Sequence, residues 1–368
     1  MIAERALAAA EQYITPVAVV DETVMEANLA RMAAVAAEHR VRLRPHAKTH
    51  KSAHVAQRQM AHGAVGLTVA TFIEAETYAG AGIKDLLIAH PPVGAAKLRR
   101  LSTLAERVRR LAVSLDDVDV ARALPERVEV LWEIDPGQHR IGTAPGQATA
   151  EGVKRLVEAI GAERFRGLIT HGGHSYGATD KAGRQRAADQ ESEGLLTTAA
   201  MLKDADVPVR ELSLGSTPTA GLSLRSGITE MRPGTYVYGD ANNVALGSQR
   251  IEDCALVVVA TVVSTPAQDR AVIDAGSKAL SADLRVARLD GYGVVLGHPG
   301  LTVARLSEEH AVLTASERTG LTIGDRVAII PAHACTTVNL HPAVLFVSTE
   351  GSTRWVAVDA RGWQQRYD

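Results

Sequence analysis

The sequence is poor in cysteine and carries almost no net charge, and both features narrow the class of protein. Among 368 residues only Cys254 and Cys335 are cysteines, and the formal net charge is −2. This balance predicts neither a basic surface for nucleic acid nor an acidic tail. The two cysteines could pair, but a cytoplasmic protein keeps its thiols reduced. A cysteine near a histidine is then a candidate for metal binding or catalysis.

Long apolar runs and targeting signals are also missing. No uncharged apolar stretch is long enough to span a bilayer. The segment Met1–Arg5 is not a charged start followed by a long apolar run, so we expect no signal peptide and a cytoplasmic location. The chain is too long for one small core, which predicts one large domain and a smaller one.

Apolar runs alternate with helical segments through the first two thirds of the chain. The runs read as strands are 42–44, 65–70, 85–89, 111–115, 128–134, 165–169, 209–214 and 229–238. This alternation predicts a parallel sheet, and about eight units in roughly 220 residues fit a (β/α)8 barrel. A doubly wound open sheet is the alternative. No G-x-G-x-x-G follows the first strand, which disfavours that sheet and a dinucleotide site.

After about residue 246 the pattern changes to short strands separated by turn residues, which predicts a small all-β domain. Its expected strands are 254–263, 271–274, 301–304, 310–313, 326–330, 344–347 and 355–358. We therefore assign residues 16–245 to the barrel and residues 246–368 to a C-terminal β domain. Residues 1–15 are expected to form a short helical lead-in that could pack on the β domain.

The residues with unusual chemistry follow the expected barrel strands. In such a barrel the active site lies at the C-terminal ends of the strands. The relevant segments are 44–51 with Lys48, His90, 135–142, 171–176, 215–219 and 232–235. A lysine at a strand end, partly buried and near other cations, can lose its proton and attack a carbonyl. The alternative for the segment around Lys48 is a solvated basic turn.

The last two of these segments are rich in glycine and hydroxyl groups. Glycines let backbone N–H groups approach a phosphate closely, and hydroxyls add donors. The alternative is two ordinary turns. A phosphate site facing a strand-end lysine is the layout expected for pyridoxal 5′-phosphate, whose aldehyde needs an amine partner.

Seven segments together resemble the D-serine dehydratase / D-threonine aldolase family of fold-type III pyridoxal phosphate enzymes. They are 44–50, 63–82, 135–142, 174–176, 215–219, 232–234 and 331–338, and the resemblance covers nearly the whole chain. It implies an alanine racemase-like barrel followed by a C-terminal β domain. It also implies that Lys48 holds the cofactor and removes the α-proton, that Arg140 hydrogen-bonds the cofactor's phenolic oxygen, and that Tyr176 lies near the pyridine nitrogen. The implied phosphate ligands are Gly215, Ser216, Thr217, Gly234 and Thr235.

A metal is the second expected group. His333 and Cys335 are two residues apart, so in a strand both side chains would point to one face. Imidazole plus thiolate suits Zn²⁺, with Mn²⁺ as the second choice, and water or substrate would complete the shell. The alternative is a buried core cysteine beside a surface histidine. In the family, dehydratases carry His-x-Cys here and several aldolases carry His-x-Asp, so the resemblance favours a zinc dehydratase.

The expected function is a lyase, dependent on pyridoxal phosphate and a metal, that converts D-serine, D-threonine or a similar D-β-hydroxy amino acid to a 2-oxo acid and ammonia. One alternative is D-threonine aldolase-type cleavage to glycine and an aldehyde. A racemase would need a second base, which we cannot assign. A non-catalytic cofactor carrier would resemble the barrel alone. We expect a homodimer that binds neither nucleic acid nor membrane, and Asp283 could reach the site of the partner subunit.

Overall fold

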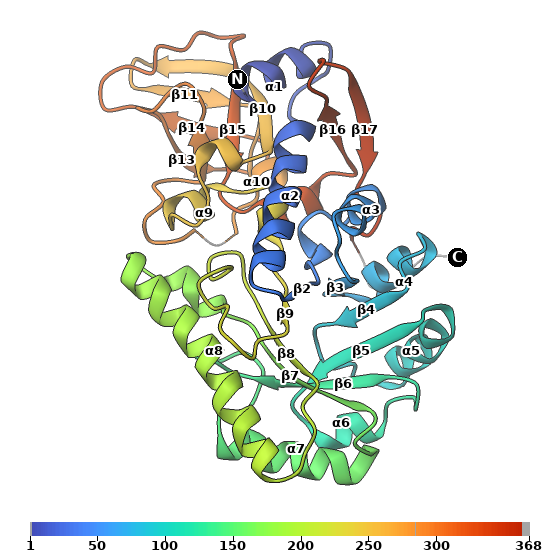
Figure 1. The fold of residues 1–368 in the computed structure, drawn as a ribbon. Helices are drawn as coiled ribbons and strands as arrows, with labels where there is room; N and C mark the ends of the chain where they lie inside the picture. The colour runs from blue at the N-terminus through green and yellow to red at the C-terminus, as the bar shows by residue number, and fades with distance from the viewer. Residues whose placement is uncertain (1, 284, 363–368) are drawn as a thin grey trace. The chain divides into compact units, whose positions relative to one another are not determined.

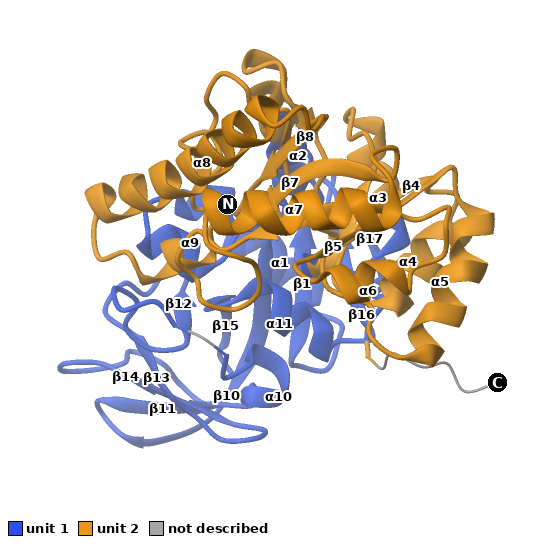
Figure 2. Ribbon diagram, turned by 90° about the horizontal axis from the view of Figure 1, so that it is seen from below, with its two compact units in different colours: residues 1–31, 49–54, 235–361 blue, residues 32–48, 55–234, 362–368 orange. Residues whose placement is uncertain are grey.

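The computed structural model describes residues 2–283 and 285–362, which form two compact units (Figure 2). The first unit consists of residues 1–31, 49–54 and 235–361. The second consists mainly of residues 32–48 and 55–234. Helices α2 (Glu22–Glu38) and α3 (Ala53–Ala61) have residues in both units. This division differs from the sequence-based boundary after residue 245, because segments at both ends of the expected barrel domain belong to the first unit.

The second unit contains the predicted barrel, an eight-stranded sheet in the order β2-β9-β8-β7-β6-β5-β4-β3 in which all paired neighbours are parallel. The two end strands are joined by a parallel bridge between His46 and Thr68, and Thr68 N donates to Pro45 O at 2.9 Å. The strands are β2 (Arg42–Leu43), β3 (Leu67–Val69), β4 (Asp85–Ile88), β5 (Arg110–Leu115), β6 (Glu129–Ile134), β7 (Phe165–Thr170), β8 (Glu211–Leu214) and β9 (Glu230–Met231). The alternation of strands and helices therefore identified this fold correctly.

Helices connect these strands and bury an apolar face against the sheet (Figure 1). They are α4 (Phe72–Gly80), α5 (Ala95–Arg107), α6 (Val118–Arg122), α7 (Gln147–Ile160) and α8 (Lys181–Asp204). Helix α4 begins where the capping pattern predicts, because the Thr71 hydroxyl accepts from Glu74 N. The last expected run, 229–238, is a strand only at β9 and then forms a 3₁₀ turn at Thr235–Val237.

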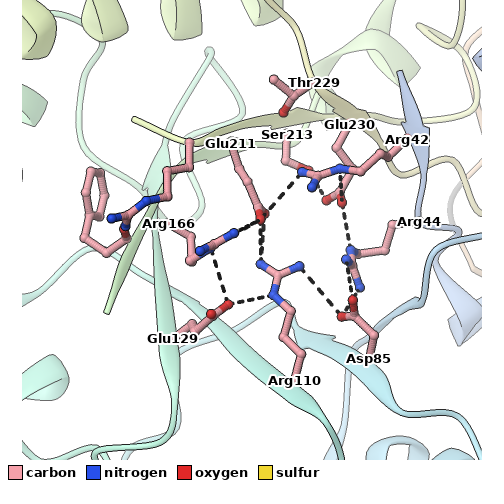
Figure 3. Close-up of polar contacts among 12 residues, drawn as sticks. Arg42, Arg44, Asp85, Arg110, Glu129, Arg166, Glu211, Ser213, Thr229 and Glu230 are labelled. Carbon is pink, nitrogen blue, oxygen red and sulfur yellow. Dashed lines mark hydrogen bonds and ion pairs between the residues drawn. The ribbon is translucent and has the colours of Figure 1, made fainter. Parts of the chain in front are cut away.

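Charged side chains gather at the N-terminal ends of the barrel strands, and we call this group the charged floor of the barrel (Figure 3). Most barrel strands begin with a charged residue, and these side chains form one network of alternating sign. Its members are Arg42, Arg44, Asp85, Arg110, Glu129, Arg166, Glu211 and Glu230. Four apolar side chains further along the strands, Leu87, Ala112, Leu131 and Ile169, form a small cluster of their own. Ile169 also lines the cavity described below, so this cluster lies next to the candidate site.

The first unit is built on a nine-stranded sheet in the order β11-β14-β13-β12-β15-β10-β1-β16-β17. Pairing of β10 with β11 closes six of these strands into a barrel around an apolar core. The strands are β1 (Val17–Asp21), β10 (Leu256–Ala267), β11 (Arg270–Ile273), β12 (Gly293–Val295), β13 (Thr302–Leu306), β14 (Ala311–Thr314), β15 (Arg326–Pro331), β16 (Ala343–Val347) and β17 (Thr353–Ala357). Its helices are α1 (Ile2–Ala10), α9 (Ala241–Ala245), α10 (Ser277–Leu280) and α11 (Ala334–Leu340).

Strand β1 joins the sheet of the first unit by pairing with β10 and β16. Helix α1 shares an apolar cluster with β1, β10 and β16, so the lead-in packs on the β domain. The sequence pattern missed β12, which is only three residues long, and the short helices α10 and α11. Among the described residues, none of the helices combines the length and hydropathy needed to cross a membrane.

Candidate active site

A cavity of about 410 Å³ opens at the C-terminal ends of the barrel strands. It is lined by His46, Lys48, Ala70, Ala89, His90, Glu133, Arg140, Ile141, Ile169, His171, Gly215 and Arg232. These residues follow or end seven different strands, which is the convergence predicted from the sequence. The volume is within the range that suits a small-molecule ligand.

Lys48 lies in a 3₁₀ turn, Ala47–Thr49, directly after β2. The turn is held on both sides: His46 N donates to Pro233 O at 3.0 Å, and the Tyr78 hydroxyl donates to Ala47 O at 3.3 Å. The Lys48 side chain is half-buried and lines the cavity. A fixed backbone thus presents one primary amine to the cavity.

Two histidines beside Lys48 are neutral. Burial, together with the positive charge of Lys48, lowers the pKa of His171 to about 3. Burial and Lys48 also hold the pKa of His46 well below its usual value. The Nδ1 atom of His171 lies 2.8 Å from Gly215 O, so Nδ1 carries the proton and Nε2 is an acceptor. The cavity therefore contains imidazoles that can accept a hydrogen bond without adding positive charge.

Glu133 and Arg232 add two buried groups of opposite sign. Burial raises the pKa of Glu133. Two groups oppose this effect in part: the Ser114 hydroxyl, which donates a hydrogen bond to the Glu133 carboxyl, and the positive charge of Arg232. The Arg232 guanidinium donates to Ser213 Oγ and to Thr170 O, both at 2.6 Å. Sequence analysis placed Arg232 only in a phosphate loop and did not single out Glu133. The signal for Glu133 was an acidic residue near the end of an apolar strand.

The expected phosphate loops are organised by Glu191, a buried carboxylate on α8. Its Oε1 accepts from Gly172 N at 2.8 Å and from Gly215 N at 2.9 Å, and its Oε2 accepts from the Thr219 hydroxyl at 2.8 Å. The Gly215 N–H therefore already donates a hydrogen bond to Glu191 and is not open to a phosphate. Neither Ser216 nor Gly234 donates its backbone N–H to another described residue. A lysine amine, guanidinium groups and free backbone N–H groups fit an aldehyde that bears a phosphate.

The remaining predicted cofactor ligands do not line this cavity. Tyr176 is half-buried in the 3₁₀ segment Gly173–Gly177, and Ser216 and Thr217 are buried in the loop after β8. Thr235 belongs to the first unit, where its hydroxyl lies 3.7 Å from the Cys335 sulfur. Their assignments as cofactor ligands stay predictions.

The candidate metal pair lies in the first unit, and its local structure differs from the expected strand. Strand β15 ends at Pro331, His333 is the N-cap of α11, and Cys335 lies in the first helical turn. The expectation that a strand aligns the two side chains was therefore wrong. They nevertheless meet, since the Cys335 thiol hydrogen-bonds the His333 side chain.

Polar groups surround the pair. His333 Nδ1 lies 2.6 Å from Asp283 Oδ2, and the Thr49 hydroxyl lies 3.1 Å from the Cys335 sulfur. Burial lowers the pKa of His333, but Cys335, Asp240 and Asp283 outweigh burial and raise it to about 10. The thiol and carboxyl groups around His333 thus favour positive charge at this position. Residues 2–283 and 285–362 contain no cluster of three or more His, Cys, Asp or Glu side chains that could hold a metal ion. A metal held by His333 and Cys335 alone would need water or substrate to complete its shell, and this assignment stays a prediction.

A strand-end lysine on a cavity of a (β/α)8 barrel, in a chain that also has a β-barrel unit, is typical of one class of pyridoxal phosphate enzymes. The family described as "Alanine racemase, N-terminal domain" matches residues 20–242, and the "Putative serine dehydratase domain" matches residues 255–347. The chain belongs to the alanine racemase-like family that includes D-serine dehydratases and D-threonine aldolases, and it is a pyridoxal phosphate-dependent lyase.

Individual relatives include both dehydratases and aldolases. The chain is 36% identical to D-threo-3-hydroxyaspartate dehydratase of Delftia sp., over 95% of this chain and 98% of the relative. It is 31% identical to D-threonine aldolase of Arthrobacter sp., over 95% of this chain and 93% of the relative. The solved Delftia structure has a TM-score of 0.87 and covers 96% of this chain and 99% of its own. A cysteine-to-alanine variant of that dehydratase, with a TM-score of 0.86 over 96% of this chain and 99% of its own, was solved in a metal-free form.

Proposed function

We propose that this lyase is a metal-dependent dehydratase of D-β-hydroxy amino acids that produces a 2-oxo acid and ammonia. Its substrates would be of the D-serine, D-threonine or 3-hydroxyaspartate type. The observation that carries the proposal is the pairing of His333 with Cys335 in a chain whose Lys48 opens onto the barrel cavity. Thr49, which contacts the Cys335 sulfur, is the residue after Lys48 in the sequence.

Each group in the cavity has a task that its chemistry permits. When bound, pyridoxal phosphate supplies a sink for the negative charge that develops at the substrate Cα. We assign its retention, and removal of the α-proton, to the Lys48 amine. Neutral His46 and His171 keep that amine in a polar environment without adding positive charge. Arg140, which also lines the cavity, provides a cation for an anionic oxygen of the cofactor or substrate.

We assign the metal to His333 and Cys335, with Zn²⁺ as the preferred ion because the ligands are imidazole and thiolate. A divalent ion there would supply Lewis-acid stabilisation for a departing β-hydroxyl. The metal-free form reported for a variant of the related dehydratase supports metal binding by that relative. Loss of water from D-threonine, followed by hydrolysis, gives 2-oxobutyrate and ammonia.

The aldolase reaction is the second candidate, because a D-threonine aldolase is among the relatives. It would leave the substrate nitrogen in glycine and release an aldehyde. The two reactions give different products from one substrate, so a product assay on D-threonine with added pyridoxal phosphate and Zn²⁺ separates them. We expect 2-oxobutyrate and ammonia in equal amounts. Glycine and acetaldehyde would overturn the dehydratase assignment while leaving the lyase class intact.

Matched substrates sharpen this assay. D-Serine should give pyruvate and ammonia, and D-threo-3-hydroxyaspartate should give oxaloacetate and ammonia. L-Threonine should give no product if the site selects the D configuration. The homodimer and the cytoplasmic location stay predictions.

A further inference from the structure

Asp283 lies against the His333 ring as the result of packing between two short helices. Helix α10 ends at Leu280, and its last carbonyl accepts from the Thr337 hydroxyl of α11 at 2.8 Å. His341, the C-cap residue of α11, places its Nε2 atom 3.0 Å from Ala279 O. These contacts set the segment after α10 beside the start of α11. Asp283 Oδ2 thereby lies 2.6 Å from His333 Nδ1.

This contact determines which ring nitrogen of His333 is available. A carboxylate oxygen only accepts hydrogen bonds, so the proton of a neutral imidazole must lie on Nδ1. The lone pair then lies on Nε2, and a metal binds an imidazole through a lone pair. Histidine ligands in metal sites commonly donate their other N–H to a carboxylate, which fixes the ring orientation and the tautomer.

We propose that Asp283 is the positioning residue of the metal site, holding His333 so that Nε2 is directed to the ion. The proposal rests on the metal role in the proposed function and adds a residue to it. Asp283 acts through His333 and is not itself a ligand. Asp240 supports the same turn, since its Oδ2 accepts from Ala334 N at 3.1 Å.

A purely structural ion pair would behave differently. The side chains of Asp283 and His333 are 43% and 23% exposed, and pairs with this exposure contribute little to folding. Removal of the Asp283 carboxylate should therefore leave the metal-free protein as stable as before. Its effect should be on metal affinity, where loss of such a partner typically costs about 10- to 100-fold.

The test measures Zn²⁺ affinity of the full chain with pyridoxal phosphate bound, by competition with a chromophoric chelator. Asp283→Ala should weaken Zn²⁺ binding by about 10- to 100-fold. Asp283→Asn keeps an oxygen acceptor for the Nδ1 proton and should restore affinity to within a few-fold of the unsubstituted protein. Asp290→Ala, an exposed aspartate of the same unit, is the matched control and should have no effect.

The outcomes separate this inference from the metal role itself. If the unsubstituted protein binds no Zn²⁺, the metal role of His333 and Cys335 and the positioning role of Asp283 are both refuted. If it binds Zn²⁺ and Asp283→Ala binds equally well, only the positioning role of Asp283 is overturned. If Asp283→Asn is as weak as Asp283→Ala, orientation by a hydrogen bond is refuted. Equal melting temperatures of the metal-free variants would exclude a general loss of folding.

Discussion

The charged floor of the barrel should make Arg44 one of the most important residues for stability. Arg44 is 1% exposed, its Nε donates to Glu230 Oε2 at 2.9 Å, and its two terminal nitrogens donate to Asp85 at 2.6 and 3.3 Å (Figure 3). Arg44→Met preserves much of the side-chain length but removes the charge and all three bonds. Among the described residues, the cation nearest to Glu230 is then Arg42 at 3.7 Å, and the cation nearest to Asp85 is Arg110 at 3.7 Å.

Removal of one partner from a buried ion pair costs about 3–5 kcal/mol, and Arg44→Met should lie in this range. Glu230→Gln should cost less, about 1–3 kcal/mol, since Arg44 keeps Asp85 and the amide oxygen can still accept. The double variant should lose less than the sum, because each substitution removes the charge that the other leaves unpaired.

Urea unfolding followed by the fluorescence of Trp132, which is buried in the barrel, measures these differences. Urea is preferable to guanidinium because it does not screen the ion pairs. An Arg44→Met variant within about 0.5 kcal/mol of the unsubstituted protein would refute the argument, since that is the range of ordinary surface substitutions. So would a Glu230→Gln variant that loses more stability than Arg44→Met.

Acid should weaken the same network. Burial raises the pKa of Glu230, but the charge of Arg44 and the Ser213 hydroxyl outweigh burial and hold it below its usual value. A carboxylate with a depressed folded-state pKa contributes stability above its unfolded pKa of about 4.3, and this contribution is lost as the pH falls. The urea midpoint should therefore fall with decreasing pH below about 5, and less steeply in Glu230→Gln. Parallel pH profiles would contradict this assignment.

Three further predictions concern the site. Lys48→Ala should abolish the visible absorbance of lysine-bound pyridoxal phosphate, whereas Lys51→Ala should retain it; a surviving band in the first variant would disprove the role of Lys48. Chelation should remove activity but leave the cofactor bound, and full activity after exhaustive metal removal would rule out a catalytic metal. In Gly172→Ala the new methyl would lie 2.8 Å from Glu191 Oε2, so cofactor affinity should fall, whereas Gly177→Ala has open space and should bind normally. Equal affinities, measured by titration of the apoprotein, would show that Glu191 does not organise the loops.

At the candidate metal pair, the two-residue spacing of His333 and Cys335 predicted that the side chains lie together, and they do. The reason offered was a strand, however, and the chain forms a helix start there. Spacing in sequence constrains two side chains only through the local backbone, which a short motif does not specify. Asp283, fifty residues earlier, contacts His333 of its own chain, which the sequence did not predict. The suggestion that it could reach a partner's site stays untested.

The residues that line the cavity were also predicted only in part. Lys48, Arg140 and Gly215 were predicted from their positions after strands, and all three line it. Glu133 was not singled out, because a carboxyl within an apolar run gives no sign of whether it faces a cavity or the barrel exterior. Similarly, the pattern around Gly215 could not show that its N–H is already bonded to Glu191.

Sequence patterns were enough to predict the barrel, the all-β domain and Lys48 as the candidate cofactor lysine. These depend on periodicity and on the rule that strand ends carry the site, both of which are local or repeated features. Three features could be learned only from the folded chain: β1 pairs with β10 and β16, Glu191 accepts from the backbone of two glycine loops, and Asp283 contacts His333. Each of those contacts joins segments far apart in the chain, and their geometry is set by packing that no local pattern encodes.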